Sequence, residues 1–136
     1  KAIISGEKMS RFLSLYVATN FDEAVELAMK IQKYQGAGHS LGLHANDDGK
    51  ARHLAMAAQT CRVIVNQAHC FATGGFFDNG MPFSLSMGCG SWGGNSIDGN
   101  LNWEHFVNKV QIVRVIKENK PELEDIFRDF WEKVAQ

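Results

Sequence analysis

The chain has 136 residues, of which 45% are hydrophobic and 21% charged, a composition typical of one soluble globular domain. Its 14 Lys and Arg residues balance 15 Asp and Glu residues, so the net charge of -1 indicates neither a nucleic-acid nor an anionic-membrane partner. No apolar run approaches the ~20 residues that cross a bilayer, and no signal peptide opens the chain. Its three cysteines show no disulfide framework, which predicts a reducing, cytoplasmic location.

Three stretches in the first half of the chain have strand character. Arg11–Ala18 alternates apolar and polar residues before becoming apolar, and Ser40–Ala45 forms a second short strand. Cys61–Asn66 is apolar and β-branched, as expected of a strand buried on both faces. With helices between them, these stretches predict an α/β fold of parallel βαβ units joined by right-handed crossovers.

Two helices are expected between these strands. Asn20 is a suitable N-cap for a helix from Phe21 to about Gln35, and Gly36 is placed to end it in a left-handed conformation. Asp47 and Asp48 can cap a second helix through Ala51–Gln59, where Ala and Met favour helix formation.

The segment Gln67–Asn100 lacks helical periodicity, and eight of the 13 glycines lie between Gly74 and Gly99. Gly88–Gly93 matches G-x-G-x-x-G, but the residues after it cannot begin a stable helix. We therefore expect a tight loop and not a dinucleotide-binding turn. Cys89 within it is expected to fill a crowded turn, because no base or helix N-terminus stands beside it to activate a nucleophilic thiol.

The C-terminal region is predicted to contain a short helical turn at Asn102–Val107, a strand at Lys109–Ile116 and a helix opening near Pro121. The apolar stripe of that helix must dock on another surface. Its members are Leu123, Ile126, Phe127, Phe130, Trp131 and Val134.

Other residue types that carry chemistry give weaker signals. Cys61 begins an apolar strand and is expected in the core, and Cys70 beside His69 is no zinc site without two further ligands. His39 and His44 are five residues apart on one predicted strand, so they should point to opposite faces, and we expect no metal site. Aromatic residues crowd the glycine-rich segment and form either a satellite hydrophobic cluster or an apolar substrate tunnel. They are Phe71, Phe76, Phe77, Phe83 and Trp92.

Four motifs in register resemble the acylating, coenzyme A-dependent aldehyde dehydrogenases. Met87–Ser96 resembles their GCGSWGGNS motif, and Glu7–Ser10 resembles the EKLSPV segment. Gly36–Ser40 is similar to G-x-G-H-[ST], and Arg62–Asn66 to R-[IV]-L-[IV]-N. The resemblance covers roughly Gly6 to Ile116. Within this family, features at 81–83, 102–106 and the acidic C-terminal helix are most similar to sulfoacetaldehyde dehydrogenases, with succinate-semialdehyde and acetaldehyde enzymes as competitors.

The resemblance implies an NAD(P)-dependent enzyme that oxidises a short aldehyde and passes the acyl group to coenzyme A. Glu7 matches a glutamate that contacts the nicotinamide-side ribose, and Phe71 and Phe83 match aromatic positions of the aldehyde tunnel. The catalytic cysteine and nucleotide-binding domain of the family lie upstream of the EKLSPV segment. The resemblance thus implies that this chain holds no catalytic nucleophile and, by itself, is inactive.

The resemblance also divides the chain. Residues 1–100 correspond to the C-terminal portion of the catalytic domain, and residues 101–136 to an oligomerisation strand and C-terminal helix. We expect Lys109–Ile116 to pair with a sheet in a neighbouring subunit, giving a homo-oligomer, a dimer or tetramer. The alternative function is that of a stand-alone α/β binding or interaction module, derived from the same scaffold and without catalytic activity.

Overall fold

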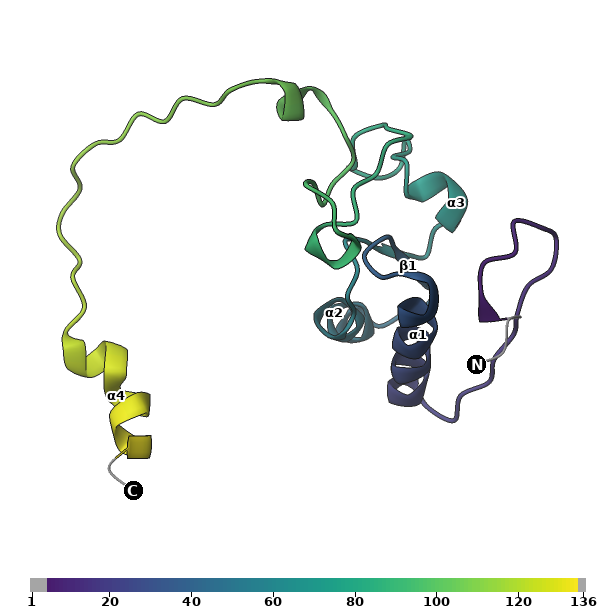
Figure 1. Cartoon of the computed structure of the whole chain (residues 1–136), viewed down its shortest axis with the longest axis horizontal. Coiled ribbons are helices and arrows are strands. Elements are labelled where there is room, and N and C mark those ends of the chain that lie inside the picture. Colours follow the sequence, from purple (N-terminus) through teal and green to yellow (C-terminus); the bar gives the residue numbers. More distant parts are fainter. Residues whose placement is uncertain (1–4, 135–136) are drawn as a thin grey trace.

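A computed structural model describes residues 5–134 of the chain (Figure 1). A folded body occupies the first three quarters of the chain, and an extended segment leads from it to a separate terminal helix (Figure 1). The elements in order are α1 (Phe21–Gln35), β1 (Leu41–Leu43), α2 (Asp48–Ala57), β2 (Val63–Val65), α3 (His69–Ala72), the 3₁₀ turns η2 (Ser91–Gly93) and η3 (Trp103–Phe106), and α4 (Leu123–Val134).

The centre of the body is a two-stranded parallel sheet. Leu41 pairs with Val63 and Leu43 with Val65, and α2 forms the crossover between the strands. This confirms the predicted α/β fold with parallel strands. The buried cluster joins α1 and α2 through Val25, Leu54 and Ala58. Partly buried residues complete it on the helices and the sheet: Phe21, Met29, Leu41, Leu43 and Val63.

The predicted caps of α1 and α2 are present. The Asn20 side chain accepts a hydrogen bond of 2.9 Å from the Glu23 amide, and Asp47 caps α2 in the same way through the Gly49 amide at 2.8 Å. Each cap satisfies one of the amide donors that a helix leaves unpaired at its start. Gly36 ends α1 with φ 130° and ψ 147°, so its φ is positive as expected, but its ψ is extended and not that of the left-handed helix.

The parallel ladder is lengthened by a side chain at the carboxyl end of β2. The Asn66 amide donates to the Leu43 carbonyl at 2.9 Å. Its side chain then bonds both backbone groups of Ala45, accepting from the nitrogen at 3.0 Å and donating to the oxygen at 2.7 Å. Asn66 adopts φ 53°, a conformation that asparagine tolerates better than most residues. This arrangement holds the turn after β1 against the end of β2.

Two predicted strands are absent from this chain's own fold. Residues 12–18 and 108–122 carry no regular secondary structure, so the strand prediction at Arg11–Ala18 is wrong. Lys109–Ile116 forms no strand within this chain, and its pairing with a neighbouring subunit stays a prediction. Both have the side-chain alternation of a strand, yet neither meets another strand edge, and a strand exists only through ladder hydrogen bonds to a neighbour. The predicted turn at Asn102–Val107 is confirmed by η3.

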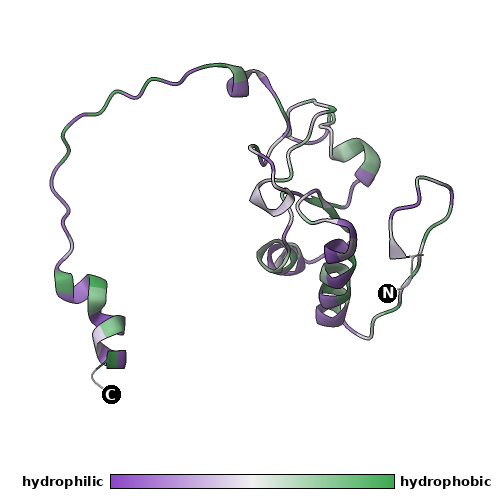
Figure 2. Cartoon of the chain, in the orientation of Figure 1, coloured by the Kyte–Doolittle hydropathy of each residue, from purple (hydrophilic) through white to green (hydrophobic). Residues whose placement is uncertain are grey.

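The terminal helix α4 begins two residues later than Pro121. The Glu122 carbonyl accepts from the amides of Asp125 and Ile126 at 3.1 and 3.2 Å, so the first helical hydrogen bonds form after the proline. Apolar and polar residues take different sides of α4 (Figure 2). Phe127 and Trp131 pack on each other with ring centroids 5.7 Å apart, and the apolar side lies open to solvent. Within residues 5–134, no helix is long and apolar enough to cross a membrane.

Candidate functional site

The glycine-rich loop Gly88–Gly94 is closed by its own backbone. The Gly90 amide donates to the Ile97 carbonyl at 3.0 Å, and the Asn95 side chain accepts from the Cys89 amide at 2.7 Å. Gly38 and Gly93 pack directly against Cys89, and a Cβ at either glycine would collide with that residue. The predicted tight loop is therefore confirmed, and Cys89 fills a crowded turn where the chain approaches the segment before β1.

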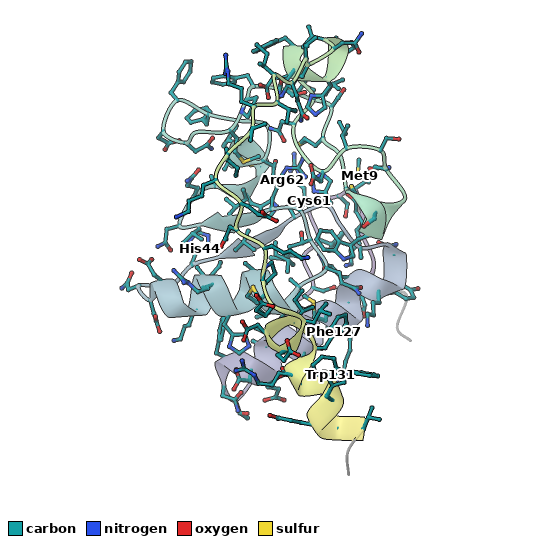
Figure 3. All side chains as sticks on the ribbon, turned by 90° about the vertical axis from the view of Figure 1, so that its left-hand side faces the viewer. Met9, His44, Cys61, Arg62, Phe127 and Trp131 are labelled. Carbon is teal, nitrogen blue, oxygen red and sulfur yellow. The ribbon has the colours of Figure 1, made fainter. Side chains whose placement is uncertain are left out.

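Arg62 connects this loop to the segment before β1. The residue is 5% exposed, and Nη1 donates to the carbonyls of His39 and Gly88 at 3.0 and 2.9 Å, while Nε donates to Asn100 Oδ1 at 3.1 Å. In the described part of the chain, no carboxylate forms an ion pair with it, and Nη2 has no hydrogen-bond partner. Figure 3 shows Arg62 beside Cys61 within the body. The guanidinium thus holds together three oxygen acceptors, the carbonyls of His39 and Gly88 and the side chain of Asn100, and we call this arrangement the clamp.

Asn100 extends the same clamp to the rest of the glycine-rich segment. Its Oδ1 receives Arg62, and its Nδ2 donates to the carbonyls of Thr73 and Pro82 at 3.0 and 2.8 Å. Asn100 is 3% exposed, so these partners replace water for a polar group that would be costly to bury unpaired. One buried Arg–Asn pair therefore orders four stretches of chain that have almost no regular secondary structure.

A chain of three polar side chains lies next to this clamp. The Ser40 hydroxyl is 2.6 Å from His39 Nδ1 and 2.8 Å from His69 Nε2, so it bridges two imidazoles from different parts of the body. Burial, with a smaller contribution from His39, lowers the pKa of His69 below its ordinary value. His39 is exposed, whereas Ser40 and His69 are half-buried. This arrangement can hold His39 in one orientation and one tautomer.

The remaining histidine and cysteine predictions can be compared with the structure. His39 lies before β1 and His44 after it, so they are separated by the length of the strand, and His44 lies apart from Arg62 (Figure 3). Among residues 5–134, no cluster of three His, Cys, Asp or Glu side chains could hold a metal ion. Cys61 is half-buried and not fully in the core, and burial raises the pKa of its thiol.

Glu7 lies in the segment before α1. Its backbone amide donates to the side chain of Gln35 at the end of α1, which anchors this segment to the body. The Glu7 side chain is exposed. A carboxylate in this position can accept two hydrogen bonds from a diol.

Phe71 and Phe83 belong to an exposed aromatic row with Phe76 and Phe77. Ring centroids are 6.1 Å apart from Phe71 to Phe76, 5.6 Å from Phe76 to Phe77 and 5.3 Å from Phe77 to Phe83. Phe71 is 63% exposed and Phe83 62%, so the row is no closed satellite core within this chain. It forms an apolar surface that can line one wall of a binding site.

Sequence patterns did not reveal the two polar constellations. Ser40 and His69 are 29 residues apart, and Arg62 and Asn100 are 38 residues apart. The adjacent His39 and Ser40 in the G-A-G-H-S stretch were a usable signal for part of the Ser40–His69 constellation. Nothing in the spacing identified Asn100.

Comparison with known proteins gives a consistent result. No family model matches the chain. The proteins to which the chain is similar are nevertheless acylating aldehyde dehydrogenases, so the chain is homologous to a part of these enzymes. It is 50% identical over 132 residues to the acylating sulfoacetaldehyde dehydrogenase of Cupriavidus necator, which covers 97% of this chain and 27% of that protein. It is 41% identical over 128 residues to the acetylating succinate-semialdehyde dehydrogenase of Clostridium kluyveri, covering 93% of this chain and 28% of that enzyme.

A solved structure gives a similar match. The crystal structure of an acetylating aldehyde dehydrogenase from Geobacillus thermoglucosidasius superposes with a TM-score of 0.73 at 30% identity, covering 87% of this chain and 26% of that one. These 136 residues therefore correspond to a little over a quarter of the length of the relatives they match.

Proposed function

We propose that the protein containing this chain is an NAD(P)-dependent, CoA-acylating aldehyde dehydrogenase, with sulfoacetaldehyde as its substrate. The observation that carries this proposal is the 50% identity to an acylating sulfoacetaldehyde dehydrogenase along nearly the whole chain. The three free thiols among the described residues support a reducing, cytoplasmic location.

Glu7 is the residue of this chain that we propose contacts the cofactor. Its backbone amide is used by Gln35, whereas its exposed carboxylate is available for the two hydroxyls of a ribose. The residue type and exposure therefore fit a nicotinamide nucleotide. When bound, NAD(P) supplies the hydride acceptor for aldehyde oxidation. Glu7 would orient the ribose.

The aldehyde is proposed to lie against the aromatic row of Phe71 and Phe83. Their exposed rings offer an apolar wall, and the neighbouring Phe76 and Phe77 hold the row together. A wall of this kind excludes water from a thioester, which protects the acyl group from hydrolysis before transfer.

His39 is the group that we propose removes a proton from the coenzyme A thiol. The reaction needs a base at this step because the thiolate, not the thiol, is the nucleophile. His39 is exposed, its carbonyl is fixed by Arg62 at 3.0 Å, and its Nδ1 is engaged by Ser40. Its Nε2 can take the proton while the electron pair of the S–H bond remains on sulfur.

We also propose that residues 1–100 belong to the catalytic domain and 101–136 to an oligomerisation segment. In support, Val113 is 87% exposed and Val115 fully exposed in the unpaired stretch before α4. When such a stretch adopts the strand conformation, its unpaired backbone groups are a template for pairing with another chain. Light scattering of the protein at micromolar concentration should give at least a dimer, and removal of residues 107–136 should lower the mass to the monomer. An unchanged mass after removal would overturn this role.

The function is tested by NADH formation from sulfoacetaldehyde in the presence of coenzyme A, with the gene product that contains this chain. Succinate semialdehyde and acetaldehyde serve as competing substrates. We expect the highest kcat/KM for sulfoacetaldehyde and mass-spectrometric detection of its acyl-CoA product. Absence of NADH formation with all three aldehydes would favour the alternative, a binding module without catalytic activity.

A further inference from the structure

The contact between His39, Ser40 and His69 includes one residue, His69, that has no role in the function proposed above. Ser40 Oγ lies between two imidazole nitrogens, at 2.6 Å from His39 Nδ1 and 2.8 Å from His69 Nε2. A hydroxyl has one proton to donate. If it donates to one ring nitrogen, it can accept only from the other, so the bridge couples the tautomers of the two rings.

The surroundings favour one direction of these hydrogen bonds. His69 is half-buried and packs against Gly42 of β1, where a Cβ would approach Nδ1 to 2.8 Å. Partial burial and the neighbouring His39 lower the pKa of His69, and the Nε2 of a neutral ring can accept the Ser40 proton. Ser40 then accepts from a protonated His39 Nδ1, which leaves the lone pair of His39 on Nε2.

We propose that Ser40 and His69 are positioning residues that fix the ring of His39 with its basic Nε2 directed away from the body. This inference rests on the proposed role of His39 in acyl transfer to coenzyme A. It adds that the competence of His39 depends on His69, which contacts Ser40 from 29 residues further along the chain.

Charged and titratable groups around His39 are compatible with this role. Arg62 donates to the His39 carbonyl through Nη1. Cys89 lies against Gly38 on the other side. Cys70 follows His69 in α3 and is exposed. No carboxylate contacts either ring in the described part of the chain, so the Ser40 bridge is the main determinant of the His39 tautomer.

The first test reads the tautomer directly. In the full chain with ¹⁵N-labelled histidine, long-range ¹H–¹⁵N spectra at pH 8 should show His39 with its proton on Nδ1 and His69 with its lone pair on Nε2. Ser40→Ala should convert His39 to a mixture of tautomers, whereas Ser40→Thr, which keeps the hydroxyl, should preserve the single form. A His39 tautomer that does not change in Ser40→Ala would overturn the inference.

The second test separates the two halves of the reaction in the gene product that contains this chain. Ser40→Ala and His69→Leu should leave the first burst of NADH unchanged and slow the CoA-dependent turnover by about 3- to 10-fold, as expected for the loss of one hydrogen bond. They should also shift the acidic limb of the kcat profile against pH. His69→Gln, whose side-chain oxygen can accept from Ser40, should restore most of the rate.

His44→Gln is the matched control, because His44 is an exposed histidine at the far end of β1. It should match the wild-type burst, turnover and pH profile. Wild-type turnover that is retained in both Ser40→Ala and His69→Leu would overturn the positioning role. If the wild-type protein gives no CoA-dependent turnover at all, the proposed function fails, and the spectra of His39 still decide whether Ser40 fixes its tautomer.

Discussion

Replacement of Arg62 by Met should destabilise the body by about 2 kcal/mol. The substitution keeps an apolar stem and removes the guanidinium that holds Asn100 Oδ1 and the Gly88 carbonyl. Each of these buried acceptors left unpaired costs about 1–3 kcal/mol, which gives about 2–6 kcal/mol together. Against this, Arg62 Nη2 is buried without a partner, and its removal returns about 1–3 kcal/mol.

Chemical denaturation with guanidinium chloride measures this change. Hydrogen exchange should also show faster exchange of the Gly90 and Asn95 amides, because the loop loses its attachment to the segment before β1. Arg52→Met on the exposed surface of α2 is the matched control and should change stability by less than about 0.5 kcal/mol. If Arg62→Met is no more destabilising than Arg52→Met, the clamp does not order these loops.

Three further outcomes are expected. Glu7→Gln should lower kcat/KM for NAD(P) by about 10- to 100-fold with little change in the melting temperature, and an unchanged value would exclude the ribose contact. Asn20→Ala should cost about 1 kcal/mol in denaturant unfolding through loss of the α1 cap. Because the folded pKa of His69 lies below its ordinary value, protonation favours unfolding. Stability should therefore be highest above pH 6.5 and decline as the pH falls below it, less steeply in His69→Gln than in His44→Gln.

Local patterns predicted the parts of the fold that depend on neighbouring residues. The Asn20 cap and the period of the apolar residues gave α1 its observed limits, Phe21–Gln35. The strands were harder to predict, because alternation describes which side chains face a core but not whether a partner strand is present. Lys109–Ile116 has the pattern and no partner.

The candidate site depends even more than the fold on contacts between residues that are distant in the sequence. The glycine motif could be interpreted from its own spacing, since helix formation after Gly93 was excluded by local sequence. The Arg62–Asn100 pair and the Ser40–His69 contact arise only when distant loops fold together. Of the residues assigned by resemblance, Phe71 and Phe83 share one exposed row, and Glu7 lies in a different segment, anchored to α1.

The extended stretch from residue 107 to residue 122 acts as a tether of defined length. Fully extended, it spans roughly 50 Å, so α4 can meet surfaces well beyond the body that carries it. If the tether of one copy of this chain engages a second copy, the tether of that second copy is confined to the same small volume, and its local concentration reaches the millimolar range. A weak contact made by the apolar side of α4 would then suffice for lasting association, because each contact raises the probability of the next.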